Sequence, residues 1–243
     1  MTPLLITIGP SHYCEKARWA LQRAHIPFRE SAHAPVLHLF RTVPRGRRAT
    51  PLLMADGHIL ADSTDILHWV DKRVPPSQRL FPDEPGARAE VERWEHLFDD
   101  DLGPHVRRVT YFHLLPEKEL ALPIMSIGAP RSEALALRVG YPLVRRMISR
   151  SLKVTAEGEA SSLAKVRGVL ADVDRALGQG HKYLVGDRFS AADLTFAALA
   201  APLLQPKNPD LVDLPSAFAT LAREARSTAA GRFGLRLLHE ERG

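Results

Sequence analysis

Residues 11–14, Ser-His-Tyr-Cys, place a hydroxyl and the only thiol of the chain three positions apart. The stretch follows an apolar run, residues 4–8, and leads into a helical pattern over residues 15–25. The start of a helix presents unpaired backbone N–H groups and roughly half a positive charge, which stabilise anions such as thiolates. The spacing therefore predicts thiol chemistry, carried out either by Cys14 or by a bound thiol held beside Ser11.

The flanking sequence predicts the elements that hold this stretch in place. An apolar run such as residues 4–8 is typical of a strand buried on both faces. Apolar side chains recur at helical spacing over residues 14–25, Pro27 ends that helix, and residues 28–31 are expected to form a second strand. A strand, a helix and a strand in this order predict a parallel pair joined by a right-handed crossover.

The residues that follow complete a small α/β unit. Residues 36–42 predict a short helix. Two short apolar runs joined by Asp56-Gly57 are a strong hairpin signal, because both turn residues tolerate positive φ. Residues 62–65 supply capping side chains for a further helix. Residues 1–73 therefore predict an α/β domain of the thioredoxin type.

The remainder of the chain predicts helices. Residues 74–87 have the proline and glycine content of a linker. Residues 88–243 carry no strand signal and are expected to form an all-helical domain, in which Ser190 and Asp193 fit a capping box. We expect an irregular excursion over residues 116–130. The helical patterns cover residues 88–115, 131–153, 159–178, 190–204 and 214–229.

The composition limits the class of function. The 243 residues carry a net charge of +5, with 28 acidic residues spread among the basic ones, which favours a mildly basic enzyme over a nucleic-acid-binding protein. One cysteine excludes an internal disulfide framework and a cysteine-cluster metal site, and it suits a reducing, cytoplasmic compartment. No signal peptide and no apolar run of about 18 residues is visible, so we expect no membrane-spanning segment. We also expect no metal cofactor.

The order of these motifs resembles that of the glutathione transferase superfamily, whose members join a thioredoxin-like domain to an all-helical one. Ser11-x-x-Cys14 resembles the active-site turn of bacterial members. Thr50-Pro51 stands where the family has a cis-proline before its third strand, and Asp62-Ser63 resembles the pair that holds the γ-glutamyl end of glutathione. The resemblance covers nearly the whole chain.

The resemblance implies that Ser11 activates the thiol of glutathione by donating a hydrogen bond to its sulfur. An unperturbed thiol has a pKa of about 8.5, and a drop of two units is worth roughly 2.7 kcal/mol. A charge-assisted hydrogen bond and a helix end together supply about that much. The alternative is that Ser11 only caps the helix. Cys14 competes for the catalytic role, but it holds the second position of the turn, so it also suits an inert buried residue or a site of oxidative regulation.

Four further residues bind glutathione in this interpretation. A cis bond before Pro51 would expose the main chain of Thr50, which would pair with the cysteinyl part of glutathione as an added strand. Asp62 would meet the amino group of glutathione and Ser63 its γ-glutamyl carboxylate. Both residues also suit helix caps.

Two candidates are less well defined by the pattern. Arg48 is favoured over Arg47 for the glycyl carboxylate of glutathione, with a solvated surface arginine as the alternative. Tyr13 is expected to contact glutathione from within the turn, and its neighbour His12 is expected to be solvated.

The second substrate is expected between the domains, against residues 94–115. Aromatic residues at helical spacing also suit a core, so a packing role stays open for these candidates. Residues 99–101, three aspartates in a row, are expected to form a solvated acidic turn. The candidates for the pocket wall are His105, Tyr111, Phe112 and His113.

Residues 131–153 predict a basic amphipathic helix, with six basic residues and one acid, Glu133. Such a helix suits either packing with a solvated basic face or contact with an anionic surface or partner. Its apolar side consists of Leu135, Val139, Leu143 and Met147.

The resemblance implies an enzyme that conjugates the glutathione thiolate to a hydrophobic, electrophilic small molecule, with glutathione as co-substrate and a homodimer as the assembly. Two alternatives stay open. One is a glutathione-dependent thiol-disulfide oxidoreductase that uses Cys14. The other is a non-catalytic binding or scaffold protein that has kept the fold, because a fold does not determine a function.

Overall fold

The computed structural model describes residues 2–178 and 180–242. The sheet in the described residues has the order β2-β1-β3-β4, with β1 (Leu4–Ile8) parallel to β2 (Arg29–His33). β3 (Leu52–Ala55) runs antiparallel to β1 and forms a hairpin with β4 (His58–Leu60). The predicted crossover and hairpin are both confirmed, although β2 extends to residue 33.

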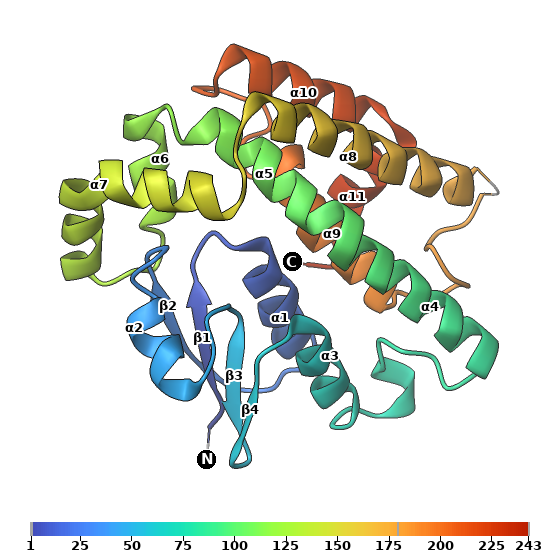
Figure 1. The fold of residues 1–243 in the computed structure, drawn as a ribbon. Helices are drawn as coiled ribbons and strands as arrows, with labels where there is room; N and C mark the ends of the chain where they lie inside the picture. The colour runs from blue at the N-terminus through green and yellow to red at the C-terminus, as the bar shows by residue number, and fades with distance from the viewer. Residues whose placement is uncertain (1, 179, 243) are drawn as a thin grey trace.

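Helices flank this sheet on both sides (Figure 1). α1 (His12–Arg23) and α3 (Ser63–Asp71) pack against each other, and α2 (Leu39–Thr42) lies on the other side of the sheet, followed by the 3₁₀ turn η1 (Val43–Arg45). α1 buries its apolar side because Ala17, Ala20 and Leu21 share one helix face, where they are at most 1% exposed. This α/β unit is the predicted N-terminal fold.

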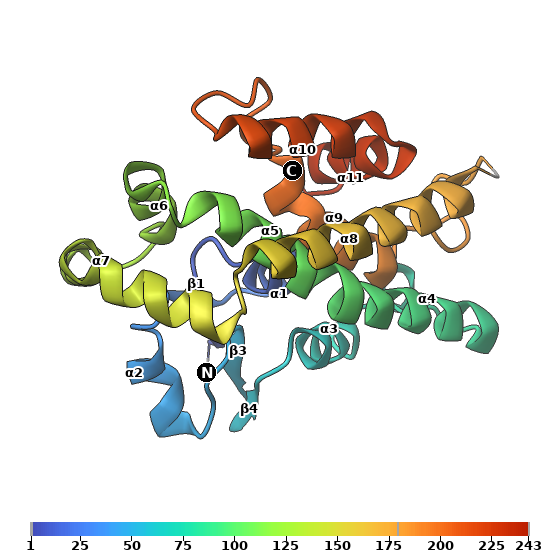
Figure 2. The ribbon, with the colours of Figure 1, turned by 45° about the horizontal axis from the view of Figure 1, so that its top comes forward.

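The helical part covers one side of the α/β unit (Figures 1 and 2). α9 is apolar on every side and lies in its interior, since Phe196, Leu199 and their neighbours are fully buried. The capping box predicted at Ser190 and Asp193 is present at its start. The elements are η2 (Pro76–Gln78), α4 (Pro85–Leu97), η3 (Phe98–Leu102), α5 (Gly103–Leu114), α6 (Lys118–Met125), α7 (Arg131–Ser151), α8 (Ala156–Leu177), α9 (Ala191–Leu204), α10 (Ser216–Ser227) and α11 (Ala229–Glu240).

Some helices differ from the sequence prediction. The expected helix 88–115 is interrupted by the π-helical turn η3, next to Pro104, which cannot donate the main-chain hydrogen bond of a continuous helix. The excursion expected to be irregular contains α6, and α11 was not predicted.

The core joins the two parts. One apolar cluster combines Leu5, Trp19 and Leu67 of the α/β unit with Trp94 and Phe98 of the helical part. The last described residues return to α1, where the Glu241 main-chain oxygen accepts a hydrogen bond from Trp19 Nε1 at 3.2 Å. The second half of α1 is therefore tied to the end of the described chain. Among the described residues, no helix has the length and apolar content needed to span a membrane.

Candidate glutathione site

Ser11 is the N-cap of α1, the role that the sequence left open as the alternative to thiol activation. Its Oγ accepts a hydrogen bond from the Cys14 main-chain N at 3.4 Å, which is longer than an ordinary N–H···O bond. The side chain is half-buried. A long cap bond costs little to exchange, so the Ser11 hydroxyl is free to turn toward a ligand at the positive end of the helix.

Cys14 lies directly beneath this hydroxyl and is fully buried. Burial raises the pKa of its thiol, and hydrogen bonds with the Thr50 and Ser11 side chains offset only part of that effect. The thiol therefore stays protonated at neutral pH and out of solvent. The same hydrogen bonds bring Ser11, Cys14 and Thr50 together, although Thr50 lies far along the chain.

The peptide bond between Thr50 and Pro51 is cis, as predicted. Leu52 pairs with Ile6 in the sheet, so the residues just before β3 run back along the end of β1. This register places Thr50 beside the turn that carries Ser11.

The start of α3 forms the next part of the site. Asp62 is exposed and caps the helix through Oδ1, which accepts a hydrogen bond from the Thr64 main-chain N at 2.8 Å, whereas Ser63 is buried. Lys16 of α1 reaches Thr64 Oγ1 at 3.2 Å and links the early turns of the two helices. Two positive helix ends thus meet on one side of the sheet, an arrangement suited to an anionic ligand.

Arg48 and Arg47 are both exposed in the loop before Thr50. The Arg48 carbonyl accepts a hydrogen bond from His38 Nε2 at 3.1 Å, and neither guanidinium has an ion-pair partner among the described residues. Both side chains are therefore available to a carboxylate.

Tyr13 is turned away from Ser11 and toward the helical part. Its hydroxyl donates to the Asp99 carbonyl at 2.9 Å, and burial raises its pKa. The guanidinium of Arg107 lies 5.8 Å from the ring centre. The structure places Tyr13 in the contact between α1 and the helical part.

The expectation that His12 is solvated is wrong. The residue is only 6% exposed, and burial, together with the nearby Arg107 charge, lowers its pKa to about 3. It is buried because α5 covers this end of α1. A neutral His12 adds no positive charge beside the thiol.

A buried ionic cluster that the sequence analysis missed lies behind the site. Lys16 Nζ, which is fully buried, forms an ion pair with Glu95 of α4 and another with Asp99 of η3, the latter at 2.7 Å. Thr64 Oγ1 is 2.5 Å from Glu95 Oε1 and 3.0 Å from Asp99 Oδ2. One lysine thus fixes α1, α3 and the helical part together.

The cluster also corrects the expectation of a solvated acidic turn at Asp99, whereas Asp100 is exposed as expected and Asp101 forms a surface ion pair with Lys165 at 2.9 Å. Burial, opposed by Lys16 and reinforced by Glu95, raises the pKa of Asp99 to about 6. Burial acts on Glu95 as well, but Lys16 and its hydrogen bonds outweigh it, so the pKa of Glu95 is lowered. One signal was present in the sequence, since Glu95 shares its helix face with the apolar Val91 and Phe98.

The candidates for the second-substrate wall lie within helix packing. His105 Nδ1 is 3.0 Å from Ser162 Oγ, the rings of His113 and Phe218 lie tilted with their centres 5.5 Å apart, and Tyr111 packs in a separate apolar cluster. That cluster belongs to the α6–α7 excursion, which we define as residues 116–153.

The α6–α7 excursion lies against the turn that carries Ser11. A methyl group added at Gly9 would collide with the carbonyl oxygen of Ile127. Glu133 of α7 binds the end of β2, accepting from the Ala34 main-chain N at 2.9 Å and lying 2.7 Å from His33 Nδ1. The excursion therefore contacts the turn that carries Ser11.

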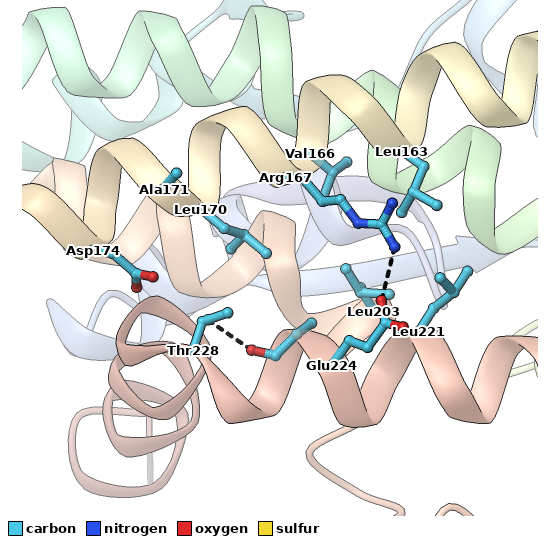
Figure 3. Close-up of a pocket in the computed structure, with 11 residues that line it drawn as sticks. Leu163, Val166, Arg167, Leu170, Ala171, Asp174, Leu203, Leu221, Glu224 and Thr228 are labelled. Atoms are coloured by element: carbon cyan, nitrogen blue, oxygen red, sulfur yellow. Dashed lines mark hydrogen bonds and ion pairs between the residues drawn. The ribbon is translucent and has the colours of Figure 1, made fainter.

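The structure also contains a cavity that none of the predicted site residues line. It has a volume of about 230 Å³ and lies between α8, α9 and α10, crossed by the ion pair of Arg167 and Glu224 at 2.8 Å (Figure 3). The described residues contain no cluster of three or more acidic, histidine or cysteine side chains arranged to hold a metal ion.

Two models of one family match most of the chain. The model of the glutathione S-transferase N-terminal domain matches residues 5–78, and the model of the C-terminal domain matches residues 146–227. The first match includes the Ser11 turn, the cis-proline and the start of α3, and the second includes the capping box of α9.

Solved structures share the fold over nearly their whole length. Beta-etherase LigF from Sphingobium sp. strain SYK-6 superposes with a TM-score of 0.62 at 19% identity, covering 97% of this chain and 99% of that one. A glutathione S-transferase from Methylobacterium radiotolerans JCM 2831, in complex with glutathione sulfonate, gives 0.56 at 22% identity, covering 97% and 95%. Poplar glutathione transferase F1 gives 0.59 at 14% identity, covering 98% of each chain.

Proposed function

The chain belongs to the glutathione S-transferase superfamily, and on that basis we propose that it transfers glutathione to an electrophilic small molecule. The observation that carries the proposal is the position of Ser11. Its hydroxyl lies at the positive end of α1, beside Thr50 and next to the start of α3. Its one hydrogen bond among the described residues that binding would break is the long bond from the Cys14 main-chain N.

In the proposed mechanism the Ser11 hydroxyl donates a hydrogen bond to the sulfur of glutathione. This bond and the helix end favour the thiolate, and a pKa lowered by two units corresponds to roughly 2.7 kcal/mol. The thiolate then attacks the electrophilic carbon and forms a C–S bond, while the leaving group departs with its electron pair. The α6–α7 excursion would contact this second substrate.

The remaining predicted residues would hold glutathione. The main chain of Thr50 would pair with the cysteinyl part, and Asp62 and Ser63 would take the γ-glutamyl amino and carboxylate groups. Arg48 would meet the glycyl carboxylate. The Methylobacterium radiotolerans neighbour, solved in complex with glutathione sulfonate, supports glutathione binding. We further propose a homodimer in the cytoplasm.

The buried, protonated Cys14 counts against the oxidoreductase alternative, because attack on a disulfide requires an accessible thiolate. The position of Tyr13 gives that residue a structural role in the proposal instead of a direct contact with glutathione.

Calorimetric titration with millimolar glutathione, followed by conjugation assays on a panel of electrophiles, tests the proposal. We expect Ser11→Ala to lower the conjugation rate at pH 7 roughly twenty-fivefold, because the thiolate fraction falls from about three quarters to about 3% when the pKa returns from about 6.5 to about 8.5. Ser161→Ala, at an exposed serine of α8, is the matched control and should leave the rate unchanged.

Three outcomes would contradict the proposal. An unchanged rate in Ser11→Ala would remove its assigned role. Loss of mixed-disulfide reduction in Cys14→Ser but not in Ser11→Ala would favour the oxidoreductase. Absence of glutathione binding would favour a scaffold protein.

A further inference from the structure

α7 has two apolar faces, and only one of them is packed. Leu137, Tyr141, Val144 and Ile148 are buried against Ala34 of the α/β unit and the residues of α6. The row identified from the sequence faces the other way and is exposed. Its members are Leu135 at 64%, Val139 at 77%, Leu143 at 63% and Met147 at 42% exposure, and we call them the α7 stripe.

The α7 stripe is unusual for this surface. Its four side chains are four of the nine exposed large hydrophobic residues in the described part of the chain, and they recur every four residues along one side of a single helix. Scattered exposed apolar residues are normal, but a continuous exposed apolar strip marks an interaction site.

The charges around the stripe have one sign. Arg131, Arg138 and Arg145 recur every seven residues and form a row beside it, and Arg146 and Arg150 lie between its members. All five are exposed, and none forms an ion pair with a described residue. The helix's one acid, Glu133, is turned inward to His33 and Ala34.

A groove adjoins the arginine row and adds to the positive charge. It has a volume of about 430 Å³, and Lys118, Arg145 and Arg146 line it together with Tyr141 and Ser149. The exposed fractions show that no described element covers this surface, and α7 begins at the outer edge of the molecule in both ribbon views (Figures 1 and 2).

The partner of this surface must offer both apolar and anionic groups. A second copy docked through the same face would bring the two arginine rows together, which is unfavourable between like charges. The phosphates of single-stranded nucleic acid would pair with the arginines, but the stripe has no aromatic side chain on which bases could stack. A bilayer of anionic phospholipid offers phosphates to the arginines and acyl chains to the stripe.

We propose that α7 binds the surface of anionic phospholipid membranes, with the α7 stripe at the boundary between headgroups and acyl chains and the arginines on lipid phosphates. The helix lies in the plane of the surface and does not span the bilayer. The proposal stands on α7 alone and does not depend on the transferase activity.

Vesicle flotation of the full chain tests the proposal. The protein should float with vesicles of phosphatidylcholine and phosphatidylglycerol in equal parts at low salt, and stay unbound with phosphatidylcholine alone. Arg131→Gln/Arg138→Gln/Arg145→Gln should weaken binding about a hundredfold, and Val139→Ser/Leu143→Ser at least about tenfold.

Matched controls distinguish binding through α7 from non-specific effects of net charge and of exposed apolar residues elsewhere. Val212→Ser changes an apolar residue that is 57% exposed elsewhere, and Lys72→Gln/Lys207→Gln/Arg223→Gln removes three exposed charges outside α7. Both controls should retain most of the binding, and circular dichroism should show the same melting temperature in all variants. A Val139→Trp reporter should shift its fluorescence to the blue on the anionic vesicles.

Any of three results would overturn the proposal. The first is a wild type that does not float with anionic vesicles at low salt, and the second is a stripe variant that binds as well as Val212→Ser. The third is a sedimentation experiment in which the wild type is a dimer and the stripe variant a monomer, because the stripe would then be a contact between copies.

Discussion

Replacing Lys16 by Met tests the buried ionic cluster directly. Lys16 is fully buried and pairs with Glu95, which is 1% exposed, and with Asp99, which is 19% exposed. Methionine fills a similar volume but leaves two carboxylates close together without a cation. Breaking a buried pair in this way costs about 3–5 kcal/mol, and we expect that loss in the free energy of unfolding at pH 8.

The loss should depend on pH, and its sign follows from Asp99. The pKa of Asp99 is raised to about 6 from its ordinary 3.8, so ionising it costs stability as the pH rises through that window. Without Lys16 the pKa of Asp99 rises further. Each additional pKa unit adds about 1.4 kcal/mol to the cost of ionising Asp99 at a pH above that pKa. At pH 5 the carboxyl is largely protonated in both proteins, so the loss should shrink by at least about 1 kcal/mol.

Urea unfolding followed by tryptophan fluorescence measures the effect, with an unchanged m-value as the check that the transition is comparable. Arg167→Met, which breaks the exposed Arg167–Glu224 pair (side chains 58% and 53% exposed), is the matched control and should cost under about 1 kcal/mol. Adding Glu95→Gln to Lys16→Met should recover about 1–2 kcal/mol, because one buried charge is removed. A loss no larger than that of the control, or the same loss at pH 5 and pH 8, would refute this account of the cluster.

Two further predictions concern the residues around Ser11. Tyr13→Phe should lower the free energy of unfolding by about 1 kcal/mol, because the hydrogen bond to the Asp99 carbonyl is lost. Gly103→Ala should lower it by about 1–3 kcal/mol, because the added methyl group would collide with the Tyr13 hydroxyl. Negligible effects of both variants in urea unfolding would contradict the contact. Native Cys14 should react with iodoacetamide at least about a hundredfold more slowly than the urea-unfolded chain, since reaction requires an opening that costs about 3 kcal/mol or more, and similar rates would show that the thiol is accessible.

The parts of the fold predicted from the sequence are those encoded in short segments. The Asp56-Gly57 hairpin, the capping box at Ser190 and the turn that begins at Ser11 depend on residues a few positions apart. Local patterns of this kind survive folding because the hydrogen bonds they predict are themselves local. The order of the motifs then led to the family that the two domain models identify.

The parts that were missed depend on contacts between distant segments. Lys16 meets acids 79 and 83 residues away, so no local pattern indicates that it is buried. His12 is buried for the same reason, since α5 covers it only in the folded chain. α7 has apolar residues on two sides, and periodicity does not determine which side packs.

The contact between Gly9 and Ile127 has a consequence for how such proteins diversify. The excursion contacts the rest of the molecule at this glycine, at the end of β2, where Glu133 binds, and through an apolar cluster shared with Ala34 and the end of α5. A relative with a different segment in place of residues 116–153 would therefore have to match this cluster as well as the contact at Gly9. The contact at position 9 requires a glycine, because any side chain there would collide with the Ile127 carbonyl oxygen. The smallest residue near the turn therefore limits which segments can pack against it.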